Sequence, residues 1–202
     1  MTQQEPGTIV DLVFPLAGKT LARDHAQALQ HALCAQFPWL GDEPCAAVHP
    51  IRLVPGTQGT AMLSRRTRLV LRVSVSRAQQ LLTLPGVALQ VGEHALQLGT
   101  PHVRELLPHA TLYAHKVAAS SPDELTLMAE LGCELAGLAI GGERVCGKHQ
   151  RMRANGQEMN VFSLMLHGLP PDQSLRLQRH GLGGHRLLGC GVFVPHKSAA
   201  AV

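Results

Sequence analysis

The amino-acid sequence predicts an α+β protein in which the order β-α-β-β-α-β occurs twice. Apolar, β-branched runs and amphipathic stretches follow one another in the same order on both sides of a proline-bounded connector at 101–108. In the second half, Asn155-Gly156 separates two strand-like runs and is the strongest short-range hairpin signal of the chain. This order is that of the ferredoxin-like fold. We therefore expect two ferredoxin-like domains in tandem, at residues 1–100 and 101–202.

The first half opens with a predicted strand at 8–16, which Pro15 ends. Thr20 is the expected cap of a helix that runs to about Phe37. Helical periodicity places one apolar stripe toward the core, formed by Ala22, Ala26, Leu29, Leu33 and Phe37. His25 falls at the edge of this stripe in the first turn, whereas His31 points to the opposite side, into solvent.

The rest of the first half reads as strand, strand, helix and strand. A short extended segment at 46–53 contains His49, and strands at 60–64 and 67–75 are joined at Arg65-Arg66. Ser76 is the expected cap of a helix that ends at Leu84, before Pro85-Gly86. A strand or hairpin at 87–98 completes the half.

The second half repeats the pattern. After a strand at 111–118, Ser121 is the expected cap of a helix to about Leu138, with Pro122 at the first helical position and Glu124 completing a capping box. The hairpin pairs 144–153 with 157–167. A helix opened by Pro170-Pro171-Asp172 ends at Gly181, and a glycine-rich loop leads into a last strand at 191–194.

Composition narrows the functional classes. A net charge of +4, a pI of about 9.0 and twelve histidines are compatible with a polyanionic partner. Aromatic residues make up only 3% of the chain, which argues against a sheet that stacks bases on several exposed rings. The five cysteines form no Cys-x-x-Cys pair, so neither a zinc site nor a disulfide framework is expected. The sequence shows no signal peptide or long apolar run, and we expect a cytoplasmic protein without a membrane or cofactor.

The glycine-rich loop, which spans 181–195, matches neither common nucleotide-binding motif. Arg186 stands where a dinucleotide fingerprint has its third glycine, and Cys190 stands where a Walker A loop has its lysine. Five glycines beside two basic side chains favour a backbone platform for an anion over a simple connecting turn. Its candidate contacts are Gly181, Gly183, Gly184, His185, Arg186, Gly189 and Gly191.

This loop, between the last helix and the last strand of a tandem ferredoxin-like chain, resembles the signature of the repeat-associated RAMP proteins of CRISPR systems. The segments 174–178 and 180–195 resemble the end of the CRISPR repeat endoribonuclease family numbered six (Cas-six). Asp24-His25 and the run 49–52, His-Pro-Ile-Arg, resemble its N-terminal half, in particular the variant named from myxobacteria. The resemblance implies a RAMP (RRM-like) fold and a metal-independent endoribonuclease that cuts precursor CRISPR RNA at each repeat. It also implies a product with a 2′,3′-cyclic phosphate, and an enzyme that stays with the repeat stem-loop beside other subunits of the effector complex.

RNA cleavage of this kind needs a base for the 2′-hydroxyl, an acid for the leaving 5′-oxygen and a cation for the phosphorane charge. The family's recurring choice is a histidine near the first helix, so His25 is our main candidate, because the helix dipole disfavours a positive charge on its ring. His49, Tyr113 and Lys116 are further catalytic candidates. Candidate contacts to an RNA stem are Lys148, Arg151, Arg153, Arg176 and Arg179.

Two other functions stay open from the sequence. The same fold can hold an RNA hairpin inside a CRISPR effector complex without cutting it. An unrelated metabolic domain that binds a small anion through the glycine loop would instead show no RNA affinity and no steep salt dependence.

Overall fold

The structure is a computed structural model that describes residues 7–57, 59–82 and 86–196. The chain divides into two compact units, residues 1–105 and 106–202, and each is described here by itself. None of the helices in the described ranges is long and apolar enough to cross a bilayer.

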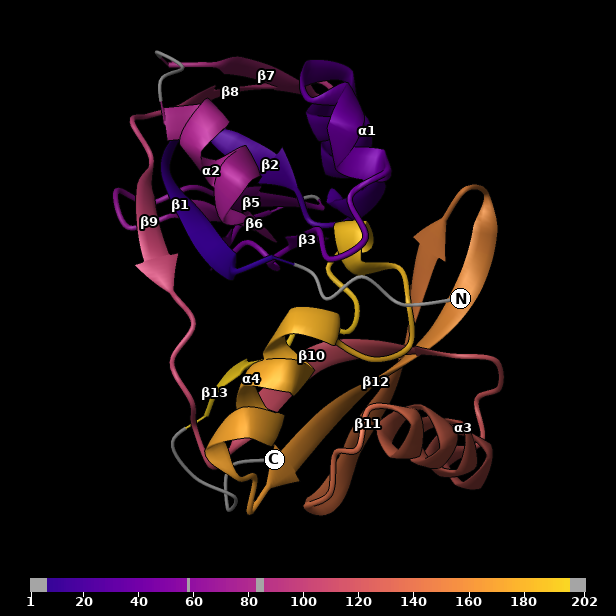
Figure 1. The fold of residues 1–202 in the computed structure, drawn as a ribbon. Coiled ribbons are helices and arrows are strands. Elements are labelled where there is room, and N and C mark those ends of the chain that lie inside the picture. Colours follow the sequence, from indigo (N-terminus) through magenta and orange to yellow (C-terminus); the bar gives the residue numbers. More distant parts are fainter. Residues whose placement is uncertain (1–6, 58, 83–85, 197–202) are drawn as a thin grey trace. The chain divides into compact units, whose positions relative to one another are not determined.

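Unit 1 is built on one main sheet, a small second sheet and two helices (Figure 1). The main sheet consists of β1 (Ile9–Ala17), β3 (Ala47–Val48), β6 (Arg68–Ser74), β7 (Ala88–Val91), β8 (His94–Leu98) and β9 (His102–Glu105). The small sheet consists of β2 (Thr20–Ala22), β5 (Thr60–Met62) and β4 (Val54–Pro55), in that order. The two α-helices are α1 (Ala26–Gln36) and α2 (Val75–Leu82), and the short 3₁₀ helix η1 (Pro38–Gly41) follows α1.

The strand pairing of the main sheet confirms the ferredoxin-like order. β1 pairs antiparallel with β6 on one side and with β9 on the other, and β3 pairs with the far edge of β6. Apolar side chains that alternate along these strands, such as Leu12 on β1 and Leu71 on β6, are completely buried. The predicted core stripe of the first helix is confirmed in part, since Leu29, Leu33 and Phe37 are buried. Ala26 is only half-buried, and Ala22 lies in β2 rather than in the helix.

The start of the first helix differs from the prediction. Thr20 does not cap a helix, because residues 20–22 form β2, which pairs with β5 and buries Leu21 completely. Helix α1 begins at Ala26, and its N-cap is His25. Pairing between segments about forty residues apart therefore overrides the local capping signal.

Three further expectations for unit 1 are corrected. The strand predicted at 60–64 joins the small sheet rather than the main one. Helix α2 begins at Val75, so Ser76 lies inside it, and the predicted end at Leu84 with Pro85 falls outside the described residues. The segment predicted as a connector contains β9, which extends the main sheet along β1.

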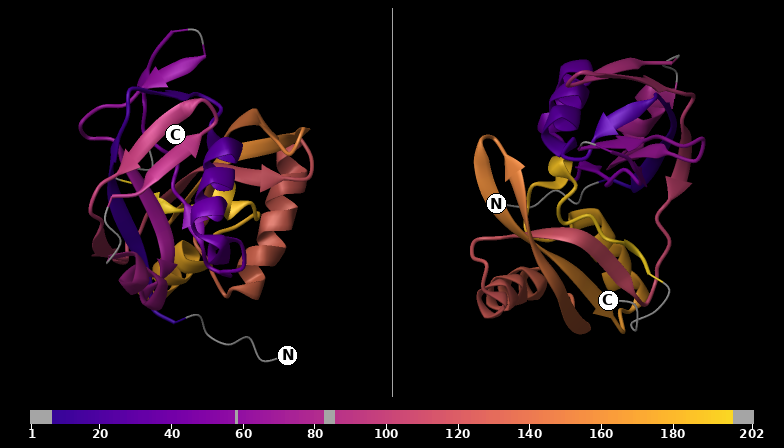
Figure 2. Two further views of the ribbon diagram at one scale, coloured as in Figure 1. Left: turned by 90° about the horizontal axis from the view of Figure 1, so that it is seen from above. Right: turned by 180° about the vertical axis from the view of Figure 1, so that it is seen from behind.

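Unit 2 is a four-stranded antiparallel sheet with two helices on one face (Figure 2). Its strands lie in the order β11 (Glu143–Ala154), β12 (Gln157–His167), β10 (Leu112–Ala119) and β13 (Val194–Pro195). Helices α3 (Glu124–Gly137) and α4 (Pro171–His180) pack through Leu127, Leu131 and Leu177 onto a buried cluster that includes Leu112 and Leu164. The last helical turn before β13 is η2 (Arg186–Leu188).

The predicted hairpin is confirmed in detail. Asn155 and Gly156 both have positive φ, 52° and 76°, as a tight two-residue turn between twisted strands requires. The tip of this hairpin extends away from α3 in both views of the ribbon (Figures 1 and 2).

Two ends of unit 2 elements differ from the prediction. The cap of α3 is Asp123, not Ser121, because the Asp123 carboxylate accepts hydrogen bonds from the Thr126 amide at 2.8 Å and its hydroxyl at 2.7 Å. The Ser121 hydroxyl instead accepts from the Asp123 amide. The last strand is also shorter than predicted, with only Val194 and Pro195 in register with β10.

Candidate functional site

His25 lies half-buried at the N-terminal end of α1, where its ring is fixed by a hydrogen bond to the backbone. Its Nδ1 is 2.8 Å from the carbonyl oxygen of Ala22. A carbonyl only accepts, so Nδ1 carries the proton, and the neutral ring has its lone pair on Nε2. This is the tautomer that a general base acting through Nε2 requires.

The segment that leads to His25 is tied to the turn between β4 and β5. The Arg23 guanidinium donates to the carbonyl of Gly56 at 2.8 Å, and the Arg23 amide donates to the carbonyl of Gly59 at 2.9 Å. These bonds hold the short stretch between β2 and α1 against the small sheet. The residues directly before His25 are therefore held in place by hydrogen bonds to the small sheet. His31 is exposed on α1, as predicted.

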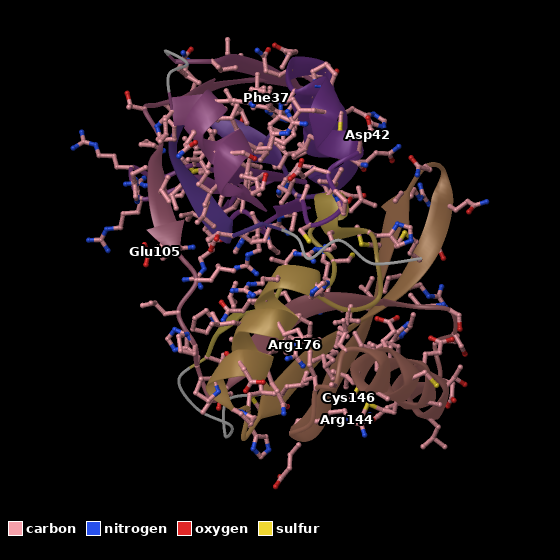
Figure 3. All side chains as sticks on the ribbon, in the orientation of Figure 1. Phe37, Asp42, Glu105, Arg144, Cys146 and Arg176 are labelled. Carbon is pink, nitrogen blue, oxygen red and sulfur yellow. The ribbon has the colours of Figure 1, made fainter. Side chains whose placement is uncertain are left out.

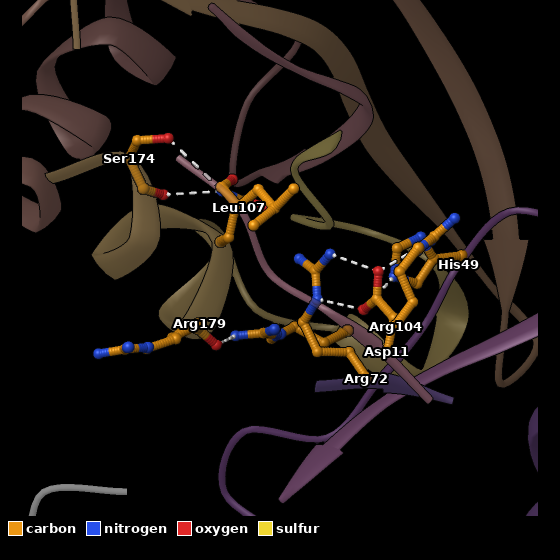
Figure 4. Close-up of polar contacts among 9 residues, drawn as sticks. Asp11, His49, Arg72, Arg104, Leu107, Ser174 and Arg179 are labelled. Atoms are coloured by element: carbon orange, nitrogen blue, oxygen red, sulfur yellow. Dashed lines mark hydrogen bonds and ion pairs between the residues drawn. The ribbon is translucent and has the colours of Figure 1, made fainter. Parts of the chain in front are cut away.

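His49 is buried in a ladder of polar side chains that crosses the main sheet of unit 1 (Figure 4). Asp11 on β1 accepts from Arg72 on β6 at 2.8 and 3.2 Å, and from Arg104 on β9 at 2.9 Å. The His49 Nε2 donates to the same carboxylate over 3.2 Å. His49 is only 8% exposed, so it contacts Asp11 inside the unit, whereas His25 is half-buried.

The ladder fixes the protonation states of its members. Burial would raise the pKa of Asp11, but the hydrogen bond from His49 and the charge of Arg72 outweigh it, and the pKa is lowered well below its usual range. Burial lowers the pKa of His49, and the charges of Arg72 and Arg104 lower it further, against the opposing effect of Asp11. The contact between His49 and Asp11 is therefore a hydrogen bond from a neutral ring at neutral pH.

Two β-bulges in unit 2 face each other across β12. Between Ala114 and Val117, β10 has two residues opposite the single Ser163, and between Cys146 and His149 β11 does the same. Lys116 and Lys148 lie in these bulges. A bulge changes the direction in which side chains point, and bulges are common next to active sites. A regular strand would place Tyr113 and His115 on one face and Lys116 on the other, and the bulge at 115–116 interrupts that alternation.

Most glycines of the glycine-rich loop are needed for close packing inside unit 2. A Cβ on Gly191 would lie 2.0 Å from the Leu182 carbonyl oxygen, and one on Gly181 would lie 2.3 Å from the Gly191 carbonyl oxygen. A Cβ on Gly183 would meet Val117 and Ala118 of β10 at 2.8 Å. The Gly191 amide donates to the Lys116 carbonyl at 2.7 Å, so the loop is fastened to the bulge.

The exposed part of the loop is short. Gly184 and His185 are exposed, and a Cβ on Gly184 would meet nothing within 4 Å. His185 and Gly189 have positive φ, 52° and 81°, and flank η2. Arg186 is half-buried, and its Nη1 donates to the Arg179 carbonyl at 2.5 Å. Of the seven predicted loop contacts, Gly184 and His185 are therefore the two that face solvent.

The basic side chains of the hairpin and of α4 differ in their surroundings. Lys148, Arg151 and Arg153 are exposed on β11, and Arg151 makes a loose, exposed ion pair of 3.5 Å with Glu158. Arg176 on α4 (Figure 3) instead donates to the carbonyls of Leu138 and Ala139 at 2.9 and 3.2 Å, so it caps the end of α3.

Arg179 forms part of a basic cluster at the end of α4, together with Arg176, Arg186 and His180. Burial lowers the pKa of His180, and these three guanidinium groups lower it further. The cluster gives the region before the glycine loop a positive potential that suits phosphate.

Some residues of these sites were missed by reasoning from the sequence. Asp11 looks like an interruption in an apolar strand, and only its pairing with Arg72 and Arg104 explains it. The alternation was a usable signal, because it places Arg68 and Arg72 on the face of β6 opposite the one with Leu69 and Leu71. His115 and His196 carried no signal, since their grouping with Tyr113 depends on the bulge and on β13.

The described residues were also compared with the ligand groups that a bound metal ion requires. Within 7–57, 59–82 and 86–196, no three side chains of His, Cys, Asp or Glu are grouped so that they could hold a metal ion.

Comparisons with known proteins agree with this fold and sequence. The model of the family described as Cas6 Crispr matches residues 10–198. The CRISPR-associated endonuclease Cas6 of Myxococcus xanthus (strain DK1622) is 34% identical over 194 residues, which cover 96% of this chain and 84% of that protein.

Solved structures share the fold at low sequence identity. A CRISPR-associated protein Cas6 superposes with a TM-score of 0.66 at 11% identity, covering 94% of this chain and all of the other. The product of a Cas6-related gene from Pyrococcus furiosus gives 0.61 at 12% identity, covering 92% and 98%. Thermus thermophilus Cse3, bound to an RNA that represents a pre-cleavage complex, gives 0.53 at 12% identity, covering 93% and 98%.

The predicted resemblance to the CRISPR repeat endoribonucleases is confirmed, including the similarity to the variant named from myxobacteria. The alternative of an unrelated metabolic domain that binds a small anion is excluded. The chain belongs to the Cas6 family of CRISPR-associated endonucleases.

Proposed function

We propose that this protein cuts precursor CRISPR RNA within its repeats, without a metal ion, and releases a 2′,3′-cyclic phosphate end. In this reaction the ribose 2′-oxygen loses its proton to a base and attacks the neighbouring phosphorus. The bond from phosphorus to the 5′-oxygen breaks, and that oxygen takes up a proton. Family membership supports the substrate class, and the RNA bound in the Cse3 structure supports RNA as the ligand of this fold.

His25 is the residue to which we assign the acid–base work. The observation that carries this assignment is the 2.8 Å contact between His25 Nδ1 and the Ala22 carbonyl, because it selects the tautomer with its lone pair on Nε2. His49 is a weaker candidate, since its Nε2 is already engaged with Asp11 and the residue is buried. Tyr113 and Lys116 stay as candidates to assist, because one is a half-buried phenol and the other lies in a bulge.

We assign RNA binding to the exposed basic groups. Lys148, Arg151 and Arg153 on the hairpin suit the phosphates of a stem, since phosphate contacts position a nucleic acid without reading its sequence. Gly184 and His185 present backbone and ring at the open part of the loop. Arg179 and Arg186 add positive charge beside it, while the carbonyl contacts of Arg176 favour a structural role. After cutting, the enzyme stays on the repeat hairpin and joins other subunits of the effector complex in the cytoplasm.

The test is cleavage of a repeat transcript in excess EDTA, compared with the same RNA carrying a single 2′-deoxy residue at the cut site. We expect full cleavage of the first and none of the second. Loss of cutting in EDTA, or undiminished cutting of the deoxy RNA, contradicts the mechanism. A wild-type protein that binds the hairpin tightly and never cuts it supports the non-cleaving subunit instead.

A further inference from the structure

Three ring side chains gather on one face of the unit 2 sheet. The ring of Tyr113, the one tyrosine of the chain, lies 4.8 Å from that of His115 in an edge-to-face arrangement of 83°. The His196 ring lies 5.3 Å from the Tyr113 ring, with an angle of 48° between the ring planes. These centroid distances are those of interacting aromatic pairs. We call Tyr113, His115 and His196 the ring cluster.

The ring cluster lies on the face of the sheet opposite the helices. Leu112 and Ala114, the neighbours of Tyr113 on β10, are buried in the core that α3 and α4 cover. Because successive side chains of a strand point to opposite faces, Tyr113 lies on the other face. Val194 is in register with Tyr113, and His196 follows two residues later with its amide bonded to the Thr111 carbonyl at 3.2 Å.

The rings are accessible to solvent, and a lysine directly follows one of them in the chain. His115 is exposed, and Tyr113 and His196 are half-buried, so the cluster is not part of the core. His115 begins the bulge that also contains Lys116. A bulge at this point lets two consecutive residues leave the regular alternation, which brings a ring and a cation to the same stretch of strand.

Solvent-accessible rings on the open face of a ferredoxin-like sheet have the chemistry of a surface that stacks unpaired bases. The low aromatic content argued against such a surface, but that count includes only Phe, Trp and Tyr, and imidazole rings also stack on bases. A paired stem does not offer its base faces, so the occupant must be an unpaired nucleotide.

We propose that the ring cluster stacks an unpaired nucleobase of the bound RNA, outside the base-paired stem. This inference rests on the proposed function, because it adds a second contact region to the same RNA substrate. It gives His115 and His196 a role in binding, and it gives Tyr113 a role that needs its ring rather than its hydroxyl.

The test uses a short single-stranded oligonucleotide of deoxyuridine with one 2-aminopurine, which cannot be cut because it has no 2′-hydroxyl. Stacking quenches the fluorescence of 2-aminopurine. We expect the wild-type protein to quench it, and the double variant His115→Ala with His196→Ala to lose the quenching and about five-fold or more in affinity. The variant His115→Phe with His196→Phe keeps the rings, so we expect it to keep the quenching.

The matched control removes two exposed histidines elsewhere, His31→Ala with His109→Ala, and should bind the probe as the wild type does. A thermal melt of each variant checks that it is folded. The inference is overturned if the wild type does not quench the probe, or if the double alanine variant quenches it fully. It is also overturned if the phenylalanine variant loses as much as the alanine variant, because the histidines would then act through their charge or hydrogen bonds.

Failure of this inference is distinguishable from failure of the proposed function. Quenching without cleavage of a repeat transcript by the same wild-type preparation overturns the endonuclease mechanism alone. Cleavage without quenching overturns the ring cluster alone. Tyr113→Phe separates the two roles of that residue, since it keeps the ring and removes the hydroxyl that catalysis would use.

Discussion

Asp11 and Arg72 face each other across β1 and β6, and the guanidinium of Arg72 holds both oxygens of the Asp11 carboxylate. Arg72 is 1% exposed and Asp11 is 3% exposed. Removing one partner of a buried ion pair leaves the other charge without compensation, which is far more destabilising than replacing both partners by apolar groups. We therefore expect any other register of β1 and β6 to be disfavoured, because it would separate these two buried charges.

We predict that Asp11→Asn lowers the free energy of unfolding by about 3–5 kcal/mol, because it leaves the Arg72 charge buried. Urea unfolding followed by circular dichroism measures the loss. The double variant Asp11→Leu with Arg72→Met should regain most of it. Arg151→Ala, which breaks the exposed contact with Glu158, is the control and should cost less than about 1 kcal/mol. Equal losses for Asp11→Asn and Arg151→Ala would contradict the structural role of the ladder.

The same ladder makes stability depend on pH through His49. The pKa of His49 is lowered in the folded protein from its ordinary value of 6.5. At a pH between the folded-state pKa and 6.5, the unfolded chain binds more protons than the folded protein. The stability contributed by His49 is therefore fully present above pH 6.5 and is lost as the pH falls below it. The lowered pKa of Asp11 adds a second loss, which begins only below about pH 4.

We therefore expect the urea midpoint to fall with acidification from about pH 6.5. His49→Gln keeps a donor for Asp11 but has no titrating ring, so its midpoint should fall less steeply than that of the wild type between about pH 6.5 and pH 4. The fall that remains comes from His180, whose pKa is also lowered in the folded protein. His31→Gln, at an exposed position, should follow the wild-type curve. A His49→Gln curve that falls together with the wild type would show that another group titrates.

Most elements of the fold could be predicted from the sequence, because the strongest signals in it are local. Asn155-Gly156 specifies a turn with two positive φ values, and no distant contact competes with it. Residues 20–22 show the opposite case, since their strand exists only through β5, and no local pattern contains that partner. Strand β9 was missed for the same reason, because its pairing with β1 joins residues about ninety apart.

The positions of the candidate site residues along the chain could be predicted from the sequence, but their contacts could not. His25 could be placed near the start of a helix, but the bond to Ala22 that selects its tautomer depends on β2. The glycines were identified as a group, yet their sequence did not tell which serve packing inside the protein and which face solvent. Arg176 and Arg151 look alike in the sequence, and only the end of α3 distinguishes them.

We predict opposite outcomes for two glycines of the loop. Gly191→Ala should prevent stable folding of unit 2, because its Cβ would lie 2.0 Å from a backbone oxygen that has no room to move. Gly184→Ala should cost only about 1–2 kcal/mol for the positive φ of 65°, since nothing lies near its Cβ. If the backbone at Gly184 contacts RNA, this variant also binds a repeat hairpin more weakly at a temperature where it is folded. Thermal melts and filter binding measure the two effects, and unchanged RNA affinity in Gly184→Ala argues against that contact.

We predict that Arg151→Ala and Arg153→Ala each weaken hairpin binding and reduce the salt dependence of that binding. A phosphate contact contributes about one unit to the slope of log affinity against log salt. Arg176→Ala is the contrasting variant, because its guanidinium caps α3 and its loss should lower stability while leaving the slope unchanged. Binding titrations at several salt concentrations measure this slope for each variant. A slope that changes for Arg176→Ala and not for the hairpin arginines would reverse the assignment of RNA contacts.

We predict that His25→Ala reduces the rate of repeat cleavage by about 10²- to 10⁴-fold, the usual contribution of a positioned acid–base group. Hairpin affinity should stay within about two-fold of the wild type, because the lost group acts on the reacting atoms rather than on the stem. Single-turnover cleavage under saturating enzyme measures the chemical step apart from binding. His31→Ala, on the same helix but exposed, is the matched control and should cut at the wild-type rate. A His25→Ala protein that cuts normally would transfer the acid–base role to another residue, with Tyr113→Phe and Lys116→Ala as the next variants to measure.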